Sequence, residues 1–250
     1  PTPKFHLYKP HIAVISGIAW DHINVFPTFE NYLEQFSIFT GKIEPEGILI
    51  HYSRDVHTQK VAGQARKDIL KIPYQEHPLT TEGNLIARSG EKIPFNLIGT
   101  HNAANVQAAL EVTRKLDIPE ETFYDAIRSF KGAARRLQEI GENKKSAVFI
   151  DCAHAPSKLK ATIEAVKNHQ PSRNLVACME LHTYSSLNKA FIRQYQGTMD
   201  KADIPMVYFN PDTIKHKNLE MLSKADVKAA FGNDRVQVYD DAQQLYTDLM

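Results

Sequence analysis

Short apolar runs alternate with longer amphipathic segments in the second half of the chain, and this alternation restricts the possible folds. The runs predicted to form buried strands are 147–151, 174–179, 206–209 and 236–239. The segments predicted to form helices between them are 156–169, 188–199 and 224–231. Alternating strands and helices are typical of a parallel sheet with helices on both faces. We therefore expect a doubly wound, Rossmann-like α/β domain in this half.

The first half of the chain predicts a less regular α/β region. Apolar runs at 11–18 and 47–52 predict strands, and a helix with Thr28 as its N-cap is expected between them. The stretch 61–95 is interrupted by glycine and proline, which predicts small strands and turns. Further elements and boundaries are expected as follows: helices at 102–116 and 120–130, a polar boundary at 141–145, and domains at 1–140 and 141–250.

Composition excludes several classes of partner. The 250 residues carry 30 basic and 29 acidic side chains, and the net charge of +1 favours neither nucleic acid nor an anionic membrane. No apolar run approaches the roughly 18 residues of a membrane span. Cys152 and Cys178 stand in apolar runs, so we expect both to be reduced and buried. These features predict a cytoplasmic protein.

Two polar clusters in the first half stand where ligand sites of open α/β sheets gather. In the segment 20–24, His22 can bind a divalent ion through a ring nitrogen. Alternatively, Asp21 caps the local chain and His22 only fills a polar niche. In the segment 99–105, the amides of Asn102 and Asn105 suit the edge of a purine. A glycine turn with an asparagine cap is the alternative.

Two more clusters flank the predicted boundary. Arg135 and Arg136 follow a glycine, and arginine forks bind phosphate oxygens; a solvated basic turn is the alternative. Asp151 ends a predicted strand, where a carboxylate can accept hydrogen bonds from ribose hydroxyls. It could equally cap the helix that follows, and the two roles are compatible.

In this order, the clusters resemble those of the Mur ligase family, the ATP-dependent enzymes that add amino acids or peptides to UDP-N-acetylmuramate in bacterial cell-wall synthesis. The matching motifs are Asp21-His22, Gly99-x-His101-Asn102-x-x-Asn105, Gly132-x-x-Arg135-Arg136 and Asp151-x-Ala153-His154-x-Pro156. The resemblance implies that residues 1–140 are the C-terminal part of a central ATPase-type domain. Residues 141–250 would be the C-terminal domain that follows it.

The resemblance also implies roles for single residues, with ATP and Mg²⁺ as cofactors. His22 would hold the metal ion, and His22 and Arg136 would act in catalysis. The residues expected to bind the nucleotide are His101, Asn102, Asn105, Arg136 and Asp151. Those expected to bind the incoming amino acid or peptide are His154, His182 and Tyr184.

Two details narrow the branch of the family. Many members carry a carbamylated lysine on the helix after the Asp-His motif, but the matching place here is about Phe36. Without this lysine, the chain is similar to the UDP-N-acetylmuramate–L-alanine ligases and to the ligases that recycle the murein tripeptide. The run Glu180–Ser186 departs from the usual Arg-Ser-Asn pattern of the tripeptide ligases. L-Alanine and tripeptide therefore both stay open as the amine substrate.

The Gly-x-Gly-Lys-Thr phosphate loop of the family does not occur in these 250 residues, and the sequence starts at Pro1. We therefore expect a fragment of a longer ligase that does not turn over ATP alone, and that could dimerise through exposed sheet surface. Two alternatives stay open. One is a ligase resembling folylpolyglutamate synthetase, and the other is a non-catalytic nucleotide-binding or scaffold module.

Overall fold

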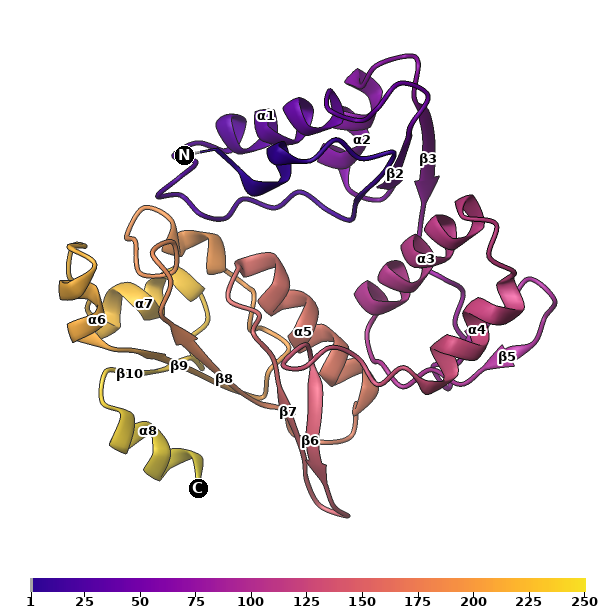
Figure 1. The fold of residues 1–250 in the computed structure, drawn as a ribbon. Helices are drawn as coiled ribbons and strands as arrows, with labels where there is room; N and C mark the ends of the chain where they lie inside the picture. The colour runs from indigo at the N-terminus through magenta and orange to yellow at the C-terminus, as the bar shows by residue number, and fades with distance from the viewer. Residues whose placement is uncertain (1) are drawn as a thin grey trace. The chain divides into compact units, whose positions relative to one another are not determined.

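The computed structural model describes residues 2–250, and the chain divides into two compact units (Figure 1). The first unit comprises Pro1–Trp20 and Val25–Gly132. The second comprises Asp21–Asn24 and Ala133–Met250. The main division thus comes earlier than the boundary expected at 141–145. Those residues instead lie in a hairpin, because strand β6 (Gln138–Glu142) pairs with strand β7 (Ala147–Ile150).

The first unit is built on a parallel sheet of three strands in the order β1-β2-β3. The strands are β1 (Ile12–Ile15), β2 (Ile48–Tyr52) and β3 (Leu70–Tyr74). Successive side chains of a strand point to opposite faces, so Leu49 and Ile50 enter different cores. Helices on both faces bury this sheet, as parallel sheets require. The expected strands at 11–18 and 47–52 are confirmed.

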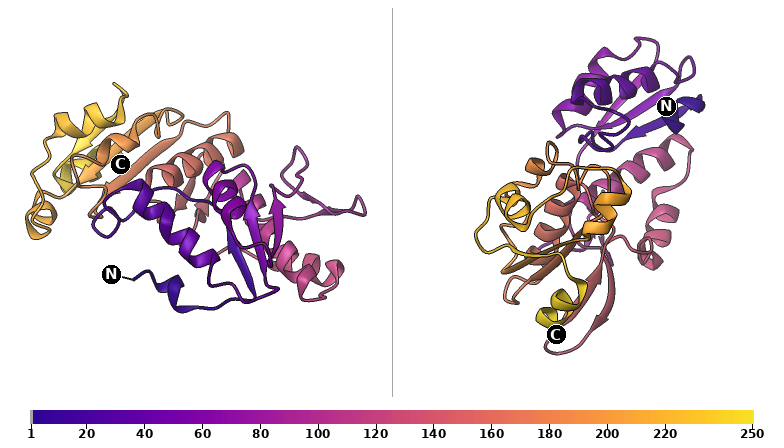
Figure 2. Two further views of the ribbon diagram at one scale, coloured as in Figure 1. Left: turned by 90° about the horizontal axis from the view of Figure 1, so that it is seen from above. Right: turned by 90° about the vertical axis from the view of Figure 1, so that its left-hand side faces the viewer.

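Helices α1 (Phe29–Thr40) and α2 (Val56–Gln64) cover the face of the sheet that carries Leu49 (Figure 2). Thr28 caps α1 as predicted, since its hydroxyl accepts the Asn31 N–H at 3.1 Å. Phe36 packs among the aromatic side chains of this face. Helix α2 was not predicted, because it is short and has little apolar periodicity. Asp55 starts it by accepting two backbone N–H groups.

Helix α3 (Thr100–Lys115) covers the opposite face, where its alanines pack against Ile50 and Tyr74. Helix α4 (Glu120–Ser129) packs on α3 and on the small antiparallel pair β4 (Leu85–Ile86) and β5 (Lys92–Ile93). A single 3-10 turn, η1 (Lys4–Leu7), precedes the sheet. The small strands expected within 61–95 and the two helices expected after them are confirmed.

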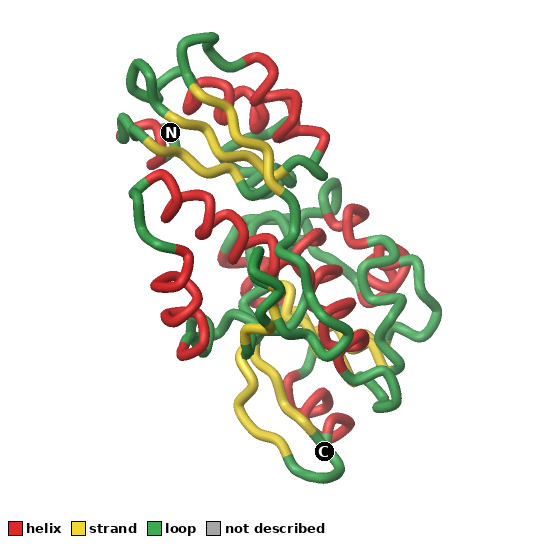
Figure 3. The backbone as a smooth tube through the Cα atoms, turned by 90° about the vertical axis from the view of Figure 1, so that its right-hand side faces the viewer, coloured by secondary structure: helices red, strands yellow, loops and turns green. Residues whose placement is uncertain are grey.

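The second unit carries a parallel sheet in the order β10-β9-β8. Its hairpin β6–β7 forms a separate pair of strands, which Figure 3 shows in yellow. The strands of the sheet are β8 (Val176–Leu181), β9 (Ile204–Phe209) and β10 (Gln237–Tyr239). The helices of this unit are α5 (Pro156–His169), α6 (Pro211–His216), α7 (Lys224–Phe231) and α8 (Ala242–Leu249). The predicted α/β class is confirmed, and so are the parallel strands expected at 174–179, 206–209 and 236–239. The run expected as a parallel strand at 147–151 instead forms β7, which pairs antiparallel with β6 outside that sheet.

The helix expected over 188–199 is wrong. This segment forms turns around a 3-10 helix, η2 (Ile192–Tyr195), with backbone bonds that mostly span three residues. The Asn188 side chain accepts the N–H groups of Ala190 and Phe191, which stabilises a turn where a helix would begin. Buried apolar residues recur every three or four positions in both conformations, so their spacing alone does not distinguish an α-helix from such turns.

The two cysteines are free but exposed, so the expectation that both are buried is wrong. Cys178 lies on β8, on the face that also exposes Val176. Cys152 lies in the loop after β7. Among residues 2–250, no helix has the length and apolar character needed to cross a membrane.

Candidate functional site

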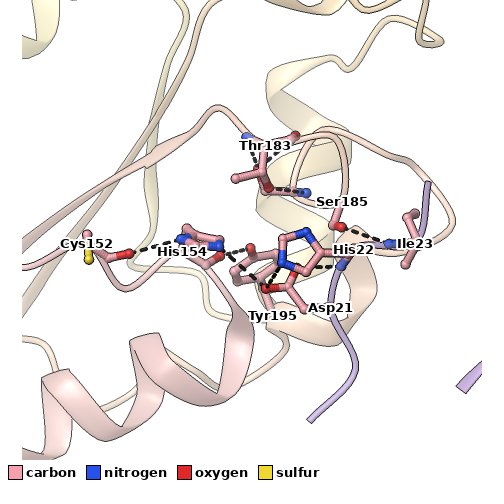
Figure 4. A network of polar contacts seen from close by, with 9 residues as sticks. Asp21, His22, Ile23, Cys152, His154, Thr183, Ser185 and Tyr195 are labelled. Atoms are coloured by element: carbon pink, nitrogen blue, oxygen red, sulfur yellow. Dashed lines mark hydrogen bonds and ion pairs between the residues drawn. The ribbon is translucent and has the colours of Figure 1, made fainter. Parts of the chain in front are cut away.

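The segment Asp21–Asn24 packs with the loops that follow strands β7 and β8 of the second unit (Figure 4). Ile23 donates its N–H to Ser185 Oγ at 3.2 Å. Ser185 is buried in the loop after β8. The carboxyl ends of parallel strands are where polar loops of an α/β sheet meet ligands, so this segment lies at the expected edge.

Asp21 is a nearly buried carboxylate, with 8% of its side chain exposed. Its Oδ1 accepts the N–H of His22 at 2.7 Å, and its Oδ2 lies 3.4 Å from Nε2 of His154. Burial alone would raise the pKa of this carboxyl. The hydrogen bonds from His154 and the His22 N–H outweigh burial and lower the pKa. Asp21 is therefore ionised at neutral pH.

His154 makes three polar contacts with groups of the second unit. Its Nδ1 lies 3.0 Å from the carbonyl oxygen of Cys152, and its Nε2 faces Asp21. The buried hydroxyl of Tyr195 donates to the carbonyl oxygen of His154. The contact with Asp21 raises the pKa of His154, although partial burial opposes this shift. The Asp21 carboxylate thus favours the protonated form of this imidazole.

His22 has a side chain that is 64% exposed, and its Nε2 lies 3.8 Å from Oδ2 of Asp21. Its backbone φ of 57° lies in the left-handed region, which turns the chain sharply after Asp21. Within residues 2–250, no group of three or more His, Cys, Asp and Glu side chains could hold a metal ion by itself. Mg²⁺ commonly takes most ligands from phosphates and water. The donors present, one imidazole and the adjacent Asp21 carboxylate, fit a metal ion that arrives with a phosphate ligand.

Asp151 follows β7 and is tied to the helix after it. Its Oδ2 accepts the hydroxyl of Thr162 at 2.6 Å, and its Oδ1 accepts the N–H of Ala153 at 3.2 Å. The N-cap of α5 is Ala155, and no side chain caps that helix. The cap role considered for Asp151 is therefore wrong. Each carboxylate oxygen keeps capacity for a further donor.

The basic turn before β6 lies beside the start of this loop. The carbonyl oxygen of Arg135 accepts the N–H of Cys152 at 3.0 Å. Arg135 has a φ of 57°, so the backbone turns sharply at this residue. Arg136 follows it with an exposed side chain. The turn thus has an ordered backbone and presents an accessible guanidinium group.

In the first unit, helix α3 starts at Gly99, whose φ of 93° favours glycine. Asn102 donates from Nδ2 to the carbonyl oxygen of Ile98 at 2.8 Å, and no side chain caps the helix. The asparagine cap considered for this motif is therefore wrong. Asn102 and Asn105 are three residues apart on α3, so their amides share one face of the helix. His101 lies in the first turn.

The loop after β8 carries the remaining predicted residues. His182 is exposed, and its ring centre lies 6.0 Å from that of His154. Tyr184 is exposed as well. The hydroxyls of Thr183 and Ser186 hydrogen-bond to each other and to local backbone, which shapes the loop. The second unit thus brings His154 and His182 together with Asp21 and His22.

Sequence reasoning missed Ser185 and Tyr195, which support this site. Ser185 is buried and accepts from Ile23. Tyr195 is buried in η2, and its ring stacks on that of Phe231 at 5.2 Å. The Thr-x-x-Ser spacing of Thr183 and Ser186 after a strand indicates an ordered polar loop. No comparable signal predicts the contact between Tyr195 and His154.

Comparison with known proteins identifies relatives over both units. The family described as "Mur ligase middle domain" matches residues 4–113, and that described as "Mur ligase, glutamate ligase domain" matches residues 135–250. A UDP-N-acetylmuramate–L-alanine ligase of Caldanaerobacter subterraneus is 30% identical over 220 residues, which cover 81% of this chain and 46% of that relative. The chain spans about half the length of the curated relatives it matches.

Solved structures show the same fold. The crystal structure of MurF from Acinetobacter baumannii matches with a TM-score of 0.73 at 18% identity, over 98% of this chain and 54% of that one. A folylpolyglutamate synthase of Thermotoga maritima matches with a TM-score of 0.59 at 16% identity, over 97% of this chain and 56% of that one. At these identities, the likeness concerns the fold alone.

Proposed function

The chain belongs to the Mur ligase family, and on that basis we propose that it is the nucleotide-handling part of an ATP-dependent, ADP-forming ligase. The ligase joins an amino acid or murein peptide to UDP-N-acetylmuramate in the cytoplasm, during synthesis or recycling of peptidoglycan. The observation that carries the proposal is the match to muramate–alanine ligases across both units, with the nucleotide motifs at ordered loop and helix starts. Single residues are assigned from those motifs.

In the proposed reaction, a carboxylate oxygen of the muramate substrate attacks the γ-phosphorus of ATP. The bond from that phosphorus to the bridging oxygen breaks, and ADP leaves. The amine of the second substrate then attacks the acyl carbon of the acyl phosphate. Inorganic phosphate leaves, and the amine loses a proton as the amide forms. Activation is needed because a carboxylate is a poor electrophile, and positioning with charge neutralisation supplies much of the rate.

Residues of the second unit would handle the metal, ribose and phosphate. His22 would hold Mg²⁺, which neutralises phosphate charge when bound. Arg136 would clamp phosphate or ribose oxygens, and its exposed guanidinium supports this role. Asp151 would accept a ribose hydroxyl, and the bond from Thr162 keeps its carboxylate oriented for that.

Residues at the start of α3 would contact adenine. Asn102 and Asn105 offer amide donors and acceptors on one face, and His101 would line the same pocket. On the substrate side, His182 and Tyr184 would face the incoming amine, because both are exposed at the carboxyl end of β8. The amine class is an amino acid or a short murein peptide.

Two other functions are less well supported. A ligase resembling folylpolyglutamate synthase shares the fold, but the muramate–alanine ligases match in sequence as well. A non-catalytic nucleotide-binding or scaffold module would keep α3 and Asp151 without turning over ATP. ADP release distinguishes this module from both ligases.

The test is a ligase assay with the longest natural chain that contains these residues. ADP release is measured with UDP-N-acetylmuramate, ATP and Mg²⁺, comparing L-alanine with L-alanyl-γ-D-glutamyl-meso-diaminopimelate. We expect release that depends on UDP-N-acetylmuramate and on one of the two amines. Release only with folate and glutamate would overturn the muramate assignment, and no release with either acceptor would support the non-catalytic module.

A further inference from the structure

Both ring nitrogens of His154 face oxygen atoms of the protein. Nδ1 lies 3.0 Å from the carbonyl oxygen of Cys152, and Nε2 lies 3.4 Å from Oδ2 of Asp21. Each nitrogen of the ring thus already has a polar partner within the second unit. A ring used in this way has little capacity left for a substrate.

Asp21 in turn fixes the backbone that presents His22. A buried carboxylate is costly unless its oxygens have donors or a cation nearby. Here Oδ1 accepts the N–H of His22, and Oδ2 faces Nε2 of His154 at 3.4 Å and, less closely, Nε2 of His22 at 3.8 Å. The short bond to the His22 N–H accompanies the left-handed φ of 57° at that residue. His154 thus contacts Asp21, and Asp21 in turn contacts His22, the residue proposed to bind the metal.

Tyr195 holds His154 from the protein interior. Its hydroxyl donates to the carbonyl oxygen of His154, and its ring is buried in a stack with Phe231. Because α7 carries Phe231, the position of His154 is coupled to the core of the second unit. A second attachment, from the Ile23 N–H to Ser185, holds the other end of the same segment.

We propose that His154 is a positioning residue which, backed by Tyr195, holds Asp21 and so fixes the segment Asp21–Asn24 that presents His22. This role replaces the substrate contact expected for His154. Only the metal role of His22 rests on the proposed function. The attachment of the segment is argued from the contacts alone.

The experiment measures solvent exchange of the backbone amides of His22 and Ile23 by NMR, without metal or nucleotide. In His154→Gln, the side chain keeps hydrogen-bonding groups but loses the imidazole ring that faces Asp21. We expect exchange at both amides to become on the order of ten-fold faster, as local opening becomes easier. Tyr195→Phe keeps the stacked ring and should give a smaller change in the same direction.

His169→Gln is the matched control, because His169 is an exposed histidine at the end of α5, away from these contacts. Amides of β8 and β9 report whether each variant keeps the fold. Unchanged exchange at His22 and Ile23 in both folded test variants would overturn the proposal. If His154→Gln alone fails to fold, Tyr195→Phe decides the question.

A second measurement separates this inference from the proposed function. Mn²⁺ with ATP is added to the unsubstituted chain, and paramagnetic broadening of the His22 ring signals is recorded. Broadening would support the metal role of His22. Its absence, together with faster amide exchange in the variants, would sink the metal role and leave the positioning role of His154 standing.

Discussion

The Asp21 carboxylate lies 3.4 Å from Nε2 of His154, although the two residues come from opposite halves of the sequence. One belongs to a segment that follows β1, and the other to the loop that follows β7. Both side chains are mostly removed from solvent, so the loss of either partner leaves a charge poorly compensated.

This pair should be energetically coupled. In a double-mutant cycle of Asp21→Asn and His154→Gln, we expect the double variant to be less destabilised than the sum of the single variants. Close pairs of this kind show coupling of roughly 0.5–3 kcal/mol. Urea unfolding of the four proteins provides the measurement. Strict additivity would show that the contact contributes nothing to stability.

Arg136→Ala should weaken the use of ATP by the ligase. A lost charge-assisted contact to a phosphate oxygen costs about 1.5–3 kcal/mol, so the KM for ATP should rise on the order of ten- to hundred-fold. Arg135→Ala is the control, since the neighbouring Arg135 is also exposed and is not assigned to the nucleotide. Equal effects of the two substitutions would mean that only general positive charge matters.

Thr162→Val should impair nucleotide binding without a change in any residue proposed to touch the nucleotide. The Thr162 hydroxyl donates to Asp151 Oδ2 at 2.6 Å, and valine of similar shape cannot. We expect a several-fold higher KM for ATP with little change in kcat, if the contact orients the Asp151 carboxylate. Thr162→Ser keeps the hydroxyl and should restore the KM. A failure of serine to restore it would point to packing instead.

His77 should make the first unit sensitive to acid. Burial lowers the pKa of His77, although its bond with Gln107 opposes this. The unfolded chain therefore binds a proton more readily, with a histidine pKa of about 6.5. By linkage, stability is present above that pH and falls as the pH drops below it.

His77→Gln should be less stable than the unsubstituted chain at pH 7.5 but should lose less stability between pH 7.5 and 5.5. Urea unfolding followed by fluorescence of Trp20, the single tryptophan, reports on this unit. His169→Gln should keep the original acid sensitivity. An unaltered pH dependence in His77→Gln would assign the effect to other groups, of which buried His51 is the next to test.

Local patterns predicted most of the elements in both units. Apolar runs bounded by glycine and proline gave the parallel strands, and the Thr28 cap gave the start of α1. Prediction failed where local spacing was ambiguous. The apolar positions from Leu187 to Met199 recur as in a helix, yet the Asn188 side chain stabilises turns instead.

The candidate site was predictable as a set of residues but not as a set of contacts. The motifs placed His22, Asp151 and His154 at loops, because such loops follow strands. The attachment of Asp21–Asn24 to the second unit depends on His154, Ser185 and their neighbours, which lie far along the chain. No periodicity within a strand or a helix encodes a contact of that range.

The outer side of β1 has a practical consequence for work with this chain. Among the described residues, β1 pairs only with β2, so one row of its backbone groups has no neighbouring strand. Val14 exposes 39% of its surface there. Edge strands of this kind pair side by side with strands of other molecules, and concentrated samples should turn cloudy with storage. Val14→Lys adds a charge that such pairing would have to bury, and should keep the preparation clear.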